Sequence, residues 1–199
     1  MSLKHSYTLF APFYDVLIDT ATRAARRRNI ELIANSPPCH VLLAGVGTGL
    51  DLPFLPRQHR YAGLDLTGAM LAKTRRRNAG LDFTAVRGDA QRLPFANDAF
   101  DAAVLHLILA VVPQPMLCLA EAARTVRPGG SVLVFDKFLR PRQAAPLRRV
   151  LNPVVRRLAT RLDVVFEDVL ATVPELELVS DEPVLARGWF RVIRLRKAG

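Results

Sequence analysis

Three glycines at alternate positions, Gly45, Gly47 and Gly49, follow an apolar run at residues 41–44. Glycine tolerates φ > 0 and has no side chain, so a ligand can lie directly against the main chain at such a turn. Asp65 ends the next apolar run, twenty residues after Gly45, and a carboxylate at that spacing is placed to accept both hydroxyls of a ribose. Together these residues predict a pocket for a cofactor that contains adenosine.

The spacing of the glycines separates the candidate cofactors. A dinucleotide-binding turn has the pattern G-x-G-x-x-G, whose last glycine lets a helix pack closely beneath a pyrophosphate. This chain has G-x-G-x-G, and the positions that would complete the longer pattern hold Leu50 and Leu52. No Gly-Lys-Ser/Thr follows the glycines, which excludes a Walker loop. The pattern therefore argues against both of these phosphate-binding turns.

Three segments resemble the class I S-adenosylmethionine-dependent methyltransferases. The glycine turn resembles their first motif, residues 88–101 resemble the block G-D-A-x-x-L-P-F…F-D, and residues 121–130 resemble the turn E-x-x-R-x-L-x-P-G-G. Their order and spacing agree over residues 40–137, which is far more specific than a single glycine motif. Tyr14-Asp15 and Pro94-Phe95 are similar to the ubiquinone/menaquinone C-methyltransferases and the bacterial phosphatidylethanolamine N-methyltransferases.

The resemblance implies S-adenosylmethionine as methyl donor and S-adenosylhomocysteine as product. Asp89 resembles the residue that binds the adenine amino group, and Ala90 would offer its backbone amide to the ring. Met70 is expected to pack on the adenine, although a methionine in the core is nearly as common. For Asp65 the alternative is an N-cap of a helix that starts at Gly68. Without the family pattern, Asp89 would belong to a plain turn.

One position departs from the family pattern. The resemblance implies an acid at position 43 that helps to hold the ammonium of the methionine moiety, but this chain has Leu43. Asp51, just past the glycines, is the residue that we expect to compensate. The predicted cofactor-binding set is therefore Gly45, Gly47, Gly49, Asp51, Asp65, Met70, Asp89 and Ala90.

Two side chains are candidates for the transfer step. Tyr14 would close over the sulfonium, where an aromatic face or a hydroxyl suits a cation, or it is an ordinary buried aromatic residue. His106 is a candidate base, or a core histidine with satisfied hydrogen bonds. A base is needed only if the acceptor arrives protonated or must become a carbanion or phenolate, because the sulfonium already makes its methyl group electrophilic. We expect no metal, since the other histidines and the cysteines lack ligand spacing: His5, His40, His59, Cys39 and Cys118.

Strand and helix patterns alternate along the chain. Apolar runs predict strands at residues 41–44, 61–64, 82–87, 101–105, 131–135, 176–179 and 190–195, and helical periodicity predicts helices at 8–35, 70–75, 115–126 and much of 143–170. This alternation predicts an α/β fold with a doubly wound, mostly parallel sheet and helices on both faces. The resemblance implies a Rossmann-like sheet of seven strands, with an antiparallel last strand inserted beside its predecessor. Right-handed crossovers would bring the candidate residues to one edge, at the carboxyl ends of the strands.

We expect a single methyltransferase domain over residues 1–199. Its parts are an N-terminal helical cap (1–36), a cofactor-binding core (37–138), a helical insertion or lid (139–172) and closing strands (173–199). The insertion carries an apolar stripe flanked by arginines. Such a stretch can lie on a membrane, cover the substrate pocket or simply face the core.

The formal net charge is +10, and arginines cluster at 26–28, 75–77, 148–149 and 156–157. Solvated helix faces explain these clusters as well as attraction to nucleic acid or an anionic membrane does. No apolar run is long enough to span a membrane, and the N-terminus lacks the pattern of a secretory signal. We therefore expect a cytoplasmic protein, with peripheral contact to the inner face of the membrane as an option. The sequence predicts no oligomeric state.

The segment after the fourth predicted strand, residues 105–115, is largely apolar. It lacks the Asn/Asp-Pro-Pro-aromatic motif that grips planar exocyclic amines, which argues against methylation of nucleic-acid bases. We expect a lipid-like or small-molecule acceptor, with a phospholipid amine first and a carbon of a quinone precursor second. The alternatives are an RNA methyltransferase that contacts phosphates through its arginines and a non-catalytic accessory protein that binds S-adenosylmethionine.

Overall fold

The computed structural model of the protein describes residues 20–140 and 163–199. Tyr14 and the other residues before position 20 in the predicted cap lie outside the described residues. Residues 141–162 of the predicted insertion, with most of its apolar stripe and its arginine clusters, lie outside them as well.

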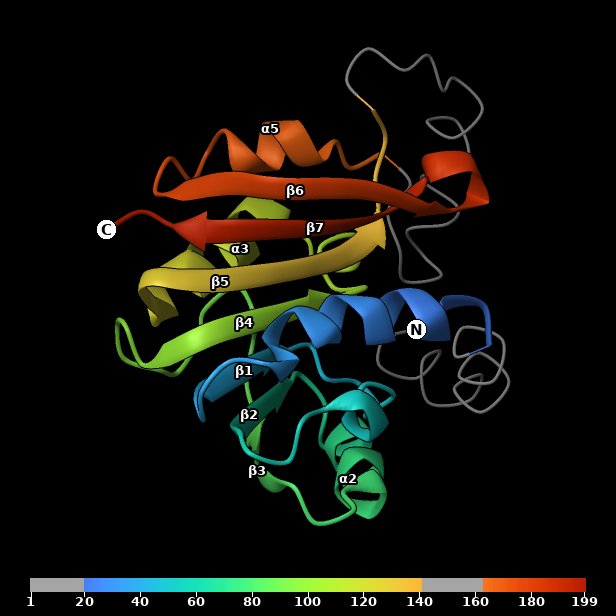
Figure 1. The fold of residues 1–199 in the computed structure, drawn as a ribbon, viewed down its shortest axis with the longest axis vertical. Helices are drawn as coiled ribbons and strands as arrows, with labels where there is room; N and C mark the ends of the chain where they lie inside the picture. The colour runs from blue at the N-terminus through green and yellow to red at the C-terminus, as the bar shows by residue number, and fades with distance from the viewer. Residues whose placement is uncertain (1–19, 141–162) are drawn as a thin grey trace.

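In the described part of the chain, seven strands form one sheet (Figure 1). They are β1 (His40–Ala44), β2 (Arg60–Asp65), β3 (Asp82–Arg87), β4 (Phe100–His106), β5 (Val126–Lys137), β6 (Leu176–Leu185) and β7 (Phe190–Lys197), in the order β3-β2-β1-β4-β5-β7-β6. The pairs from β3 to β5 are parallel, whereas β7 runs antiparallel to both β5 and β6. This confirms the predicted sheet, including the inserted antiparallel last strand.

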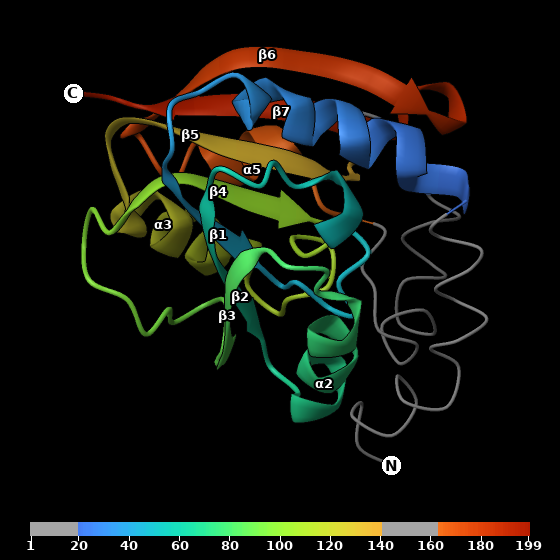
Figure 2. The same ribbon diagram turned by 60° about the horizontal axis from the view of Figure 1, so that its bottom comes forward.

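Helices cover both faces of the sheet (Figures 1 and 2). One face carries the helix of residues 20–34, called here the N-terminal helix, together with the 3-10 helix η1 (Leu52–Phe54) and α2 (Gly68–Arg77). The other face carries α3 (Pro115–Thr125) and α5 (Phe166–Leu170). Along β1 the buried side chains alternate between the cores of the two faces, which explains why this strand is a continuous apolar run in the sequence.

The start of α2 is set by a side-chain cap. The hydroxyl of Thr67 accepts a hydrogen bond from the amide of Met70 at 3.4 Å, and Thr67 is the N-cap. The alternative that Asp65 caps this helix is therefore wrong. Asp65 instead accepts hydrogen bonds from the amide and the hydroxyl of Thr67, at 2.9 and 3.1 Å, and so holds the capping residue in place.

Two strands are longer than the sequence predicts. β5 begins at Val126, which pairs with Phe100, and includes Gly129 with φ of 76°. β6 continues through the polar residues 180–182 and through Pro183. It is an edge strand, where a proline is tolerated because one side of the strand has no ladder partner.

The connection from β1 to β2 is held by backbone hydrogen bonds rather than by an α-helix. Within residues 45–59 the one helical element is η1, because Pro56 lacks the amide hydrogen that a longer helix would need. The amides of Gly45 and Val46 both donate to the carbonyl oxygen of Leu64, at 2.9 Å. The glycine turn is thus anchored directly to the end of β2.

Candidate functional site

Four strand ends meet at one edge of the sheet. β1 leads into Gly45, β2 ends with Asp65, β3 is followed closely by Asp89, and β4 ends with His106. The parallel pairing of these strands brings their carboxyl ends together, as the alternation of strands and helices predicts. Ligands of open α/β sheets bind beyond this edge.

The three glycines of the turn meet different surroundings. All three have positive φ, at 76° for Gly45, 57° for Gly47 and 80° for Gly49. A Cβ on Gly45 would lie 2.6 Å from Cδ1 of Ile108, and one on Gly49 would lie 3.2 Å from Thr74. Among the described residues, a Cβ on Gly47 would meet nothing closer than the Gly45 carbonyl oxygen, at 3.9 Å. Gly45 and Gly49 thus allow close packing of the protein itself, whereas Gly47 faces open space that a ligand can enter.

Asp65 joins the glycine turn to the start of α2. Its Oδ2 accepts a hydrogen bond from the amide of Gly47 at 3.1 Å, and its Oδ1 accepts those of Thr67. Burial raises the pKa of Asp65, although the hydrogen bonds from Thr67 and Gly47 pull the pKa downward. The carboxylate is therefore held in a fixed orientation at the end of β2, which suits an acceptor for two ribose hydroxyls.

Asp89 and Ala90 lie in the turn after β3. Asp89 is exposed and accepts a hydrogen bond from the amide of Gln91 at 2.9 Å, whereas Ala90 is buried in the core. The side-chain oxygen of Gln91 accepts a hydrogen bond from the amide of Gln114 at 2.8 Å, which ties this turn to the segment before α3. Sequence reasoning missed both glutamines, because Gln91 occupies a variable position of its motif and Gln114 lies outside the motifs.

Leu66 is an apolar residue that sequence reasoning also missed. It directly follows Asp65 and is 55% exposed. Its carbonyl oxygen accepts a hydrogen bond from the Arg87 side chain at 3.3 Å, so it lies beside the end of β3. Met70, which the sequence suggests for the adenine, is half-buried in the first turn of α2. The signal that could have found Leu66 is an apolar residue placed directly after the strand-end acid.

A buried polar cluster joins the N-terminal helix to the end of β4. The guanidinium of Arg26 donates to Oδ1 of Asp51 at 2.9 Å and to the hydroxyl of Thr22 at 3.0 Å. Nδ1 of His106 lies 3.1 Å from the same Oδ1, within ion-pair distance but without the alignment of a hydrogen bond. On the other side of the ring, Nε2 of His106 lies 3.0 Å from Nδ2 of Asn29. The N-terminal helix is thereby fixed to the residue that follows the glycine turn.

The cluster sets the charge of Asp51 and the tautomer of His106. Burial raises the pKa of Asp51, but the His106 ring and the Arg26 guanidinium outweigh it, so the pKa of this carboxyl lies below its ordinary value. Nδ2 of Asn29 can only donate, so Nε2 of a neutral His106 accepts and its proton sits on Nδ1, facing Asp51. Oδ1 of Asn29 is then buried without a hydrogen-bond partner in the described part of the chain. Sequence reasoning named Asp51 and His106 but missed Arg26 and Asn29, since their helix shows only an apolar periodicity.

Cysteine and histidine side chains elsewhere have structural surroundings. Sγ of Cys39 lies 3.4 Å from Nδ1 of His59, and burial raises the pKa of the Cys39 thiol. Cys118 belongs to α3 and is buried between this helix and the sheet. Burial raises the pKa of the Cys118 thiol to about 12. Over residues 20–140 and 163–199, no three His, Cys, Asp or Glu side chains come together as a metal site would need.

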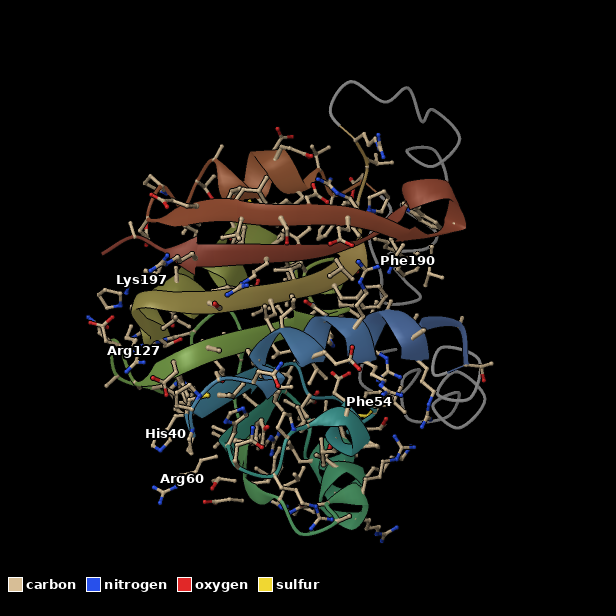
Figure 3. All side chains as sticks on the ribbon, in the orientation of Figure 1. His40, Phe54, Arg60, Arg127, Phe190 and Lys197 are labelled. Carbon is tan, nitrogen blue, oxygen red and sulfur yellow. The ribbon has the colours of Figure 1, made fainter. Side chains whose placement is uncertain are left out.

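An open hollow of about 560 Å³ lies at the opposite edge of the sheet, where β1 and β4 begin. Its lining includes His40, Asp101 and Arg127. Figure 3 labels His40 and Arg127 at this edge and Phe54 of η1 on the far side of the molecule. Asp101 accepts a hydrogen bond from the amide of His40 at 2.6 Å and pairs with Arg127 at 2.8 Å. This edge holds the amino ends of the parallel strands, whereas ligands of open α/β sheets bind beyond the carboxyl ends.

Comparison with known proteins identifies the class of the protein. A family model for a methyltransferase domain matches residues 42–134. A phosphatidylethanolamine N-methyltransferase from Cereibacter sphaeroides is 30% identical over 201 residues, which cover 98% of this chain and 98% of that relative. The chain belongs to the S-adenosylmethionine-dependent methyltransferases. It is an enzyme of this class, with S-adenosylmethionine as methyl donor, as the glycine pattern and its neighbouring motifs predict.

Two further proteins are similar to this methyltransferase. A demethylmenaquinone methyltransferase from Renibacterium salmoninarum is 35% identical over 152 residues, which cover 74% of this chain. The chain spans only 62% of the length of that relative. A solved S-adenosylmethionine-dependent methyltransferase from Thermotoga maritima has a TM-score of 0.72 at 20% identity, covering 98% of this chain and 100% of the other. This last similarity establishes the Rossmann-like fold alone.

The residues at the carboxyl edge fit an adenosyl cofactor. The space beside Gly47 is open to main-chain contact, and Asp65 presents a carboxylate held by backbone amides. Leu66 offers an exposed apolar surface to a base, and Asp89 is exposed beside it after β3. The site thus has an acceptor for sugar hydroxyls and an apolar surface for a planar base.

Proposed function

We propose that this methyltransferase transfers a methyl group to the amine of a phospholipid such as phosphatidylethanolamine. The observation that carries the proposal is the similarity to a phosphatidylethanolamine N-methyltransferase over 98% of both chains. The apolar segment after β4, which packs Ile108 against the glycine turn, also supports a lipid-like acceptor. A carbon of a quinone precursor is the second candidate, favoured by the 35% identity to a demethylmenaquinone methyltransferase.

In this proposal the chain's main task is to bind and orient the donor, whose sulfonium supplies an electrophilic methyl group. Gly47 provides main-chain contact, and Asp65 accepts charge-assisted hydrogen bonds from the ribose hydroxyls. Asp89 and the amide of Ala90 hold the edge of the adenine, while Met70 packs on the ring. Tyr14 lies outside the described residues, and its place over the sulfonium stays a prediction.

His106 is the proposed proton acceptor, because a phospholipid amine arrives as an ammonium and must lose a proton before it attacks. In the neutral side chain Nε2 accepts from Asn29 and Nδ1 faces Asp51. Protonation at Nε2 would require the Asn29 amide to turn. Its Oδ1, buried without a partner among the described residues, would then accept the new N–H.

We further propose a cytoplasmic protein that contacts an anionic membrane peripherally. No helix in the described ranges is long and apolar enough to cross a bilayer. The net charge of +10 favours association with anionic lipids. Arg75 and Arg76 at the end of α2 are exposed and available for it.

Transfer of a radioactive methyl group tests the acceptor. The purified protein is incubated with S-adenosylmethionine tritiated in the methyl group and with phosphatidylglycerol vesicles that contain phosphatidylethanolamine, demethylmenaquinone or neither. A fourth sample contains RNA in place of vesicles. The proposal predicts label in methylated phosphatidylethanolamine and little in the other samples. Label in the quinone or in RNA would overturn the proposed acceptor, and cofactor binding without transfer to any of them would favour an accessory protein.

A matched pair of carboxylate variants links the transfer to the proposed site. Asp65→Asn removes a charge at the carboxyl edge, and Asp82→Asn removes one from the other end of the neighbouring strand, where Asp82 forms an exposed pair with Arg60 at 3.3 Å. We expect Asp65→Asn to weaken cofactor binding at least about tenfold and Asp82→Asn to leave it unchanged. Equal behaviour of the two variants would remove Asp65 from the site.

A further inference from the structure

β1 provides no acid for the methionine end of the donor. Leu43, at the position where the resembling enzymes carry an acid, is 2% exposed and packs in the core with Ile30 and Leu71. The ammonium of the methionine moiety still needs an anionic partner, because a desolvated cation without one is costly. Asp51, two residues after Gly49, is the first carboxylate beyond the glycine turn.

Asp51 presents one engaged and one free oxygen. Arg26 and His106 both contact Oδ1. Over the described ranges Oδ2 has no hydrogen bond, and the side chain is 13% exposed. A carboxylate has about four acceptor positions, so Oδ2 can still accept hydrogen bonds from a ligand.

The N-terminal helix fixes this carboxylate from two directions. Arg26 binds Asp51 directly, and the guanidinium groups of Arg26 and Arg23 lie 5.5 and 5.1 Å from the ring centre of Phe54. Phe54 belongs to η1, which follows Asp51 in the chain and lies beside this helix in Figure 3. Docking of the helix therefore sets the position of Asp51 relative to the glycine turn.

We propose that Oδ2 of Asp51 binds the ammonium of the donor's methionine moiety in place of the missing acid at position 43. Arg26 and His106 are then positioning residues, which hold the carboxylate ionised and pointing its free oxygen toward the ligand. The N-terminal helix thereby contributes to the cofactor site indirectly, because its Arg26 positions Asp51 and Asp51 contacts the donor. This inference rests on the proposed function only in placing the donor at the carboxyl edge of the sheet.

The affinities of two ligands distinguish the contribution of the ammonium contact from that of the nucleoside pocket. S-adenosylhomocysteine carries the amino-acid moiety, whereas 5′-methylthioadenosine has the same nucleoside and thioether without it. Calorimetry measures both dissociation constants for the wild type, for Asp51→Asn and for the double variant Arg26→Met/Asp51→Asn. The double variant removes cation and anion together, so it leaves no unpaired buried charge to impair folding.

We expect both variants to raise the Kd of S-adenosylhomocysteine about tenfold or more, the loss of one charge-assisted hydrogen bond. The Kd of 5′-methylthioadenosine should change less than about twofold, which also demonstrates that the nucleoside pocket is folded. Arg27→Met/Glu31→Gln is the matched control, since it removes an exposed pair at 2.9 Å from the same helix. It should change neither constant.

A third variant tests the substitution of one acid for the other. Leu43→Asp in the Asp51→Asn background restores an acid at the family position and should recover part of the affinity for S-adenosylhomocysteine. An equal loss of affinity for both ligands in the Asp51 variants, or no loss for either, would overturn the inference while leaving the enzyme class intact. Failure of the wild type to bind either ligand would instead contradict the proposed donor site itself.

Discussion

Alanine substitutions in the glycine turn should affect the free energy of unfolding and the ligand affinity differently at Gly45 and at Gly47. In Gly47→Ala the new methyl group meets no atom of the described residues closer than 3.9 Å, so the expected cost is that of the left-handed backbone, about 1–2 kcal/mol. In Gly45→Ala the same backbone cost is joined by a contact of 2.6 Å to Ile108, and overpacking of this kind adds about 1–3 kcal/mol. The structure therefore predicts that Gly45→Ala lowers the free energy of unfolding more than Gly47→Ala does.

Ligand binding should follow the opposite order. The methyl group of Gly47→Ala projects into the space assigned to the donor, so we expect at least about a tenfold loss of S-adenosylhomocysteine affinity, or 1.4 kcal/mol. Denaturant unfolding gives the stabilities and calorimetry the affinities. Ile108→Ala in the Gly45→Ala background removes the clash and should recover its overpacking component. Equal stabilities of the two glycine variants, or unchanged affinity in Gly47→Ala, would refute this reading of the turn.

Three further predictions concern buried charges. The folded pKa of Asp51 lies below its ordinary value, so its ionised form stabilises the fold above about pH 4, and this contribution is lost as the pH falls through the folded pKa. The difference in unfolding free energy between wild type and Asp51→Asn should therefore shrink on acidification below about pH 4, whereas a constant gap would contradict the ion-pair cluster. Asp136→Asn should lower the free energy of unfolding, measured by chemical denaturation, by about 1–3 kcal/mol. The two carboxylate oxygens of Asp136 accept hydrogen bonds from the backbone amides of Ala110 and Lys137, at 2.9 and 2.8 Å, whereas the asparagine side chain has only one acceptor oxygen. A loss near zero would be inconsistent with these bonds. Arg191→Met leaves the carboxylates of Asp181 and Glu167 without their shared cation. Because both carboxylates keep partial access to water, we expect about 1–3 kcal/mol of destabilisation. An unchanged unfolding free energy in the same assay would contradict the ion pair.

The succession of strands along the chain and the edge at which their carboxyl ends meet could be predicted from the sequence, because both depend on local signals. Apolar runs that end in Gly45, Asp65 and His106 have the length and composition of buried parallel strands, and parallel pairing brings their ends to one edge. The extension of β6 beyond position 179 gives no such signal. Its polar residues and Pro183 are typical of a turn, and only its place at the sheet edge makes them compatible with a strand.

Contacts between distant segments could not be predicted in the same way. Arg26 and Asp51 are 25 positions apart, and Asn29 and His106 are 77 apart. Nothing in the local pattern of the N-terminal helix distinguishes these polar residues from its exposed arginines. Which of them turns inward depends on how the helix packs across β1 and β4, a property of the folded chain.

The position of a bound nucleoside tests the central claim most directly. A crystal structure of the protein with S-adenosylhomocysteine should place its ribose hydroxyls on the carboxylate of Asp65, its base beside Asp89, and its sulfur end along the main chain at Gly47. Occupancy of the hollow beside His40 and Arg127, at the opposite edge of the sheet, would contradict the account.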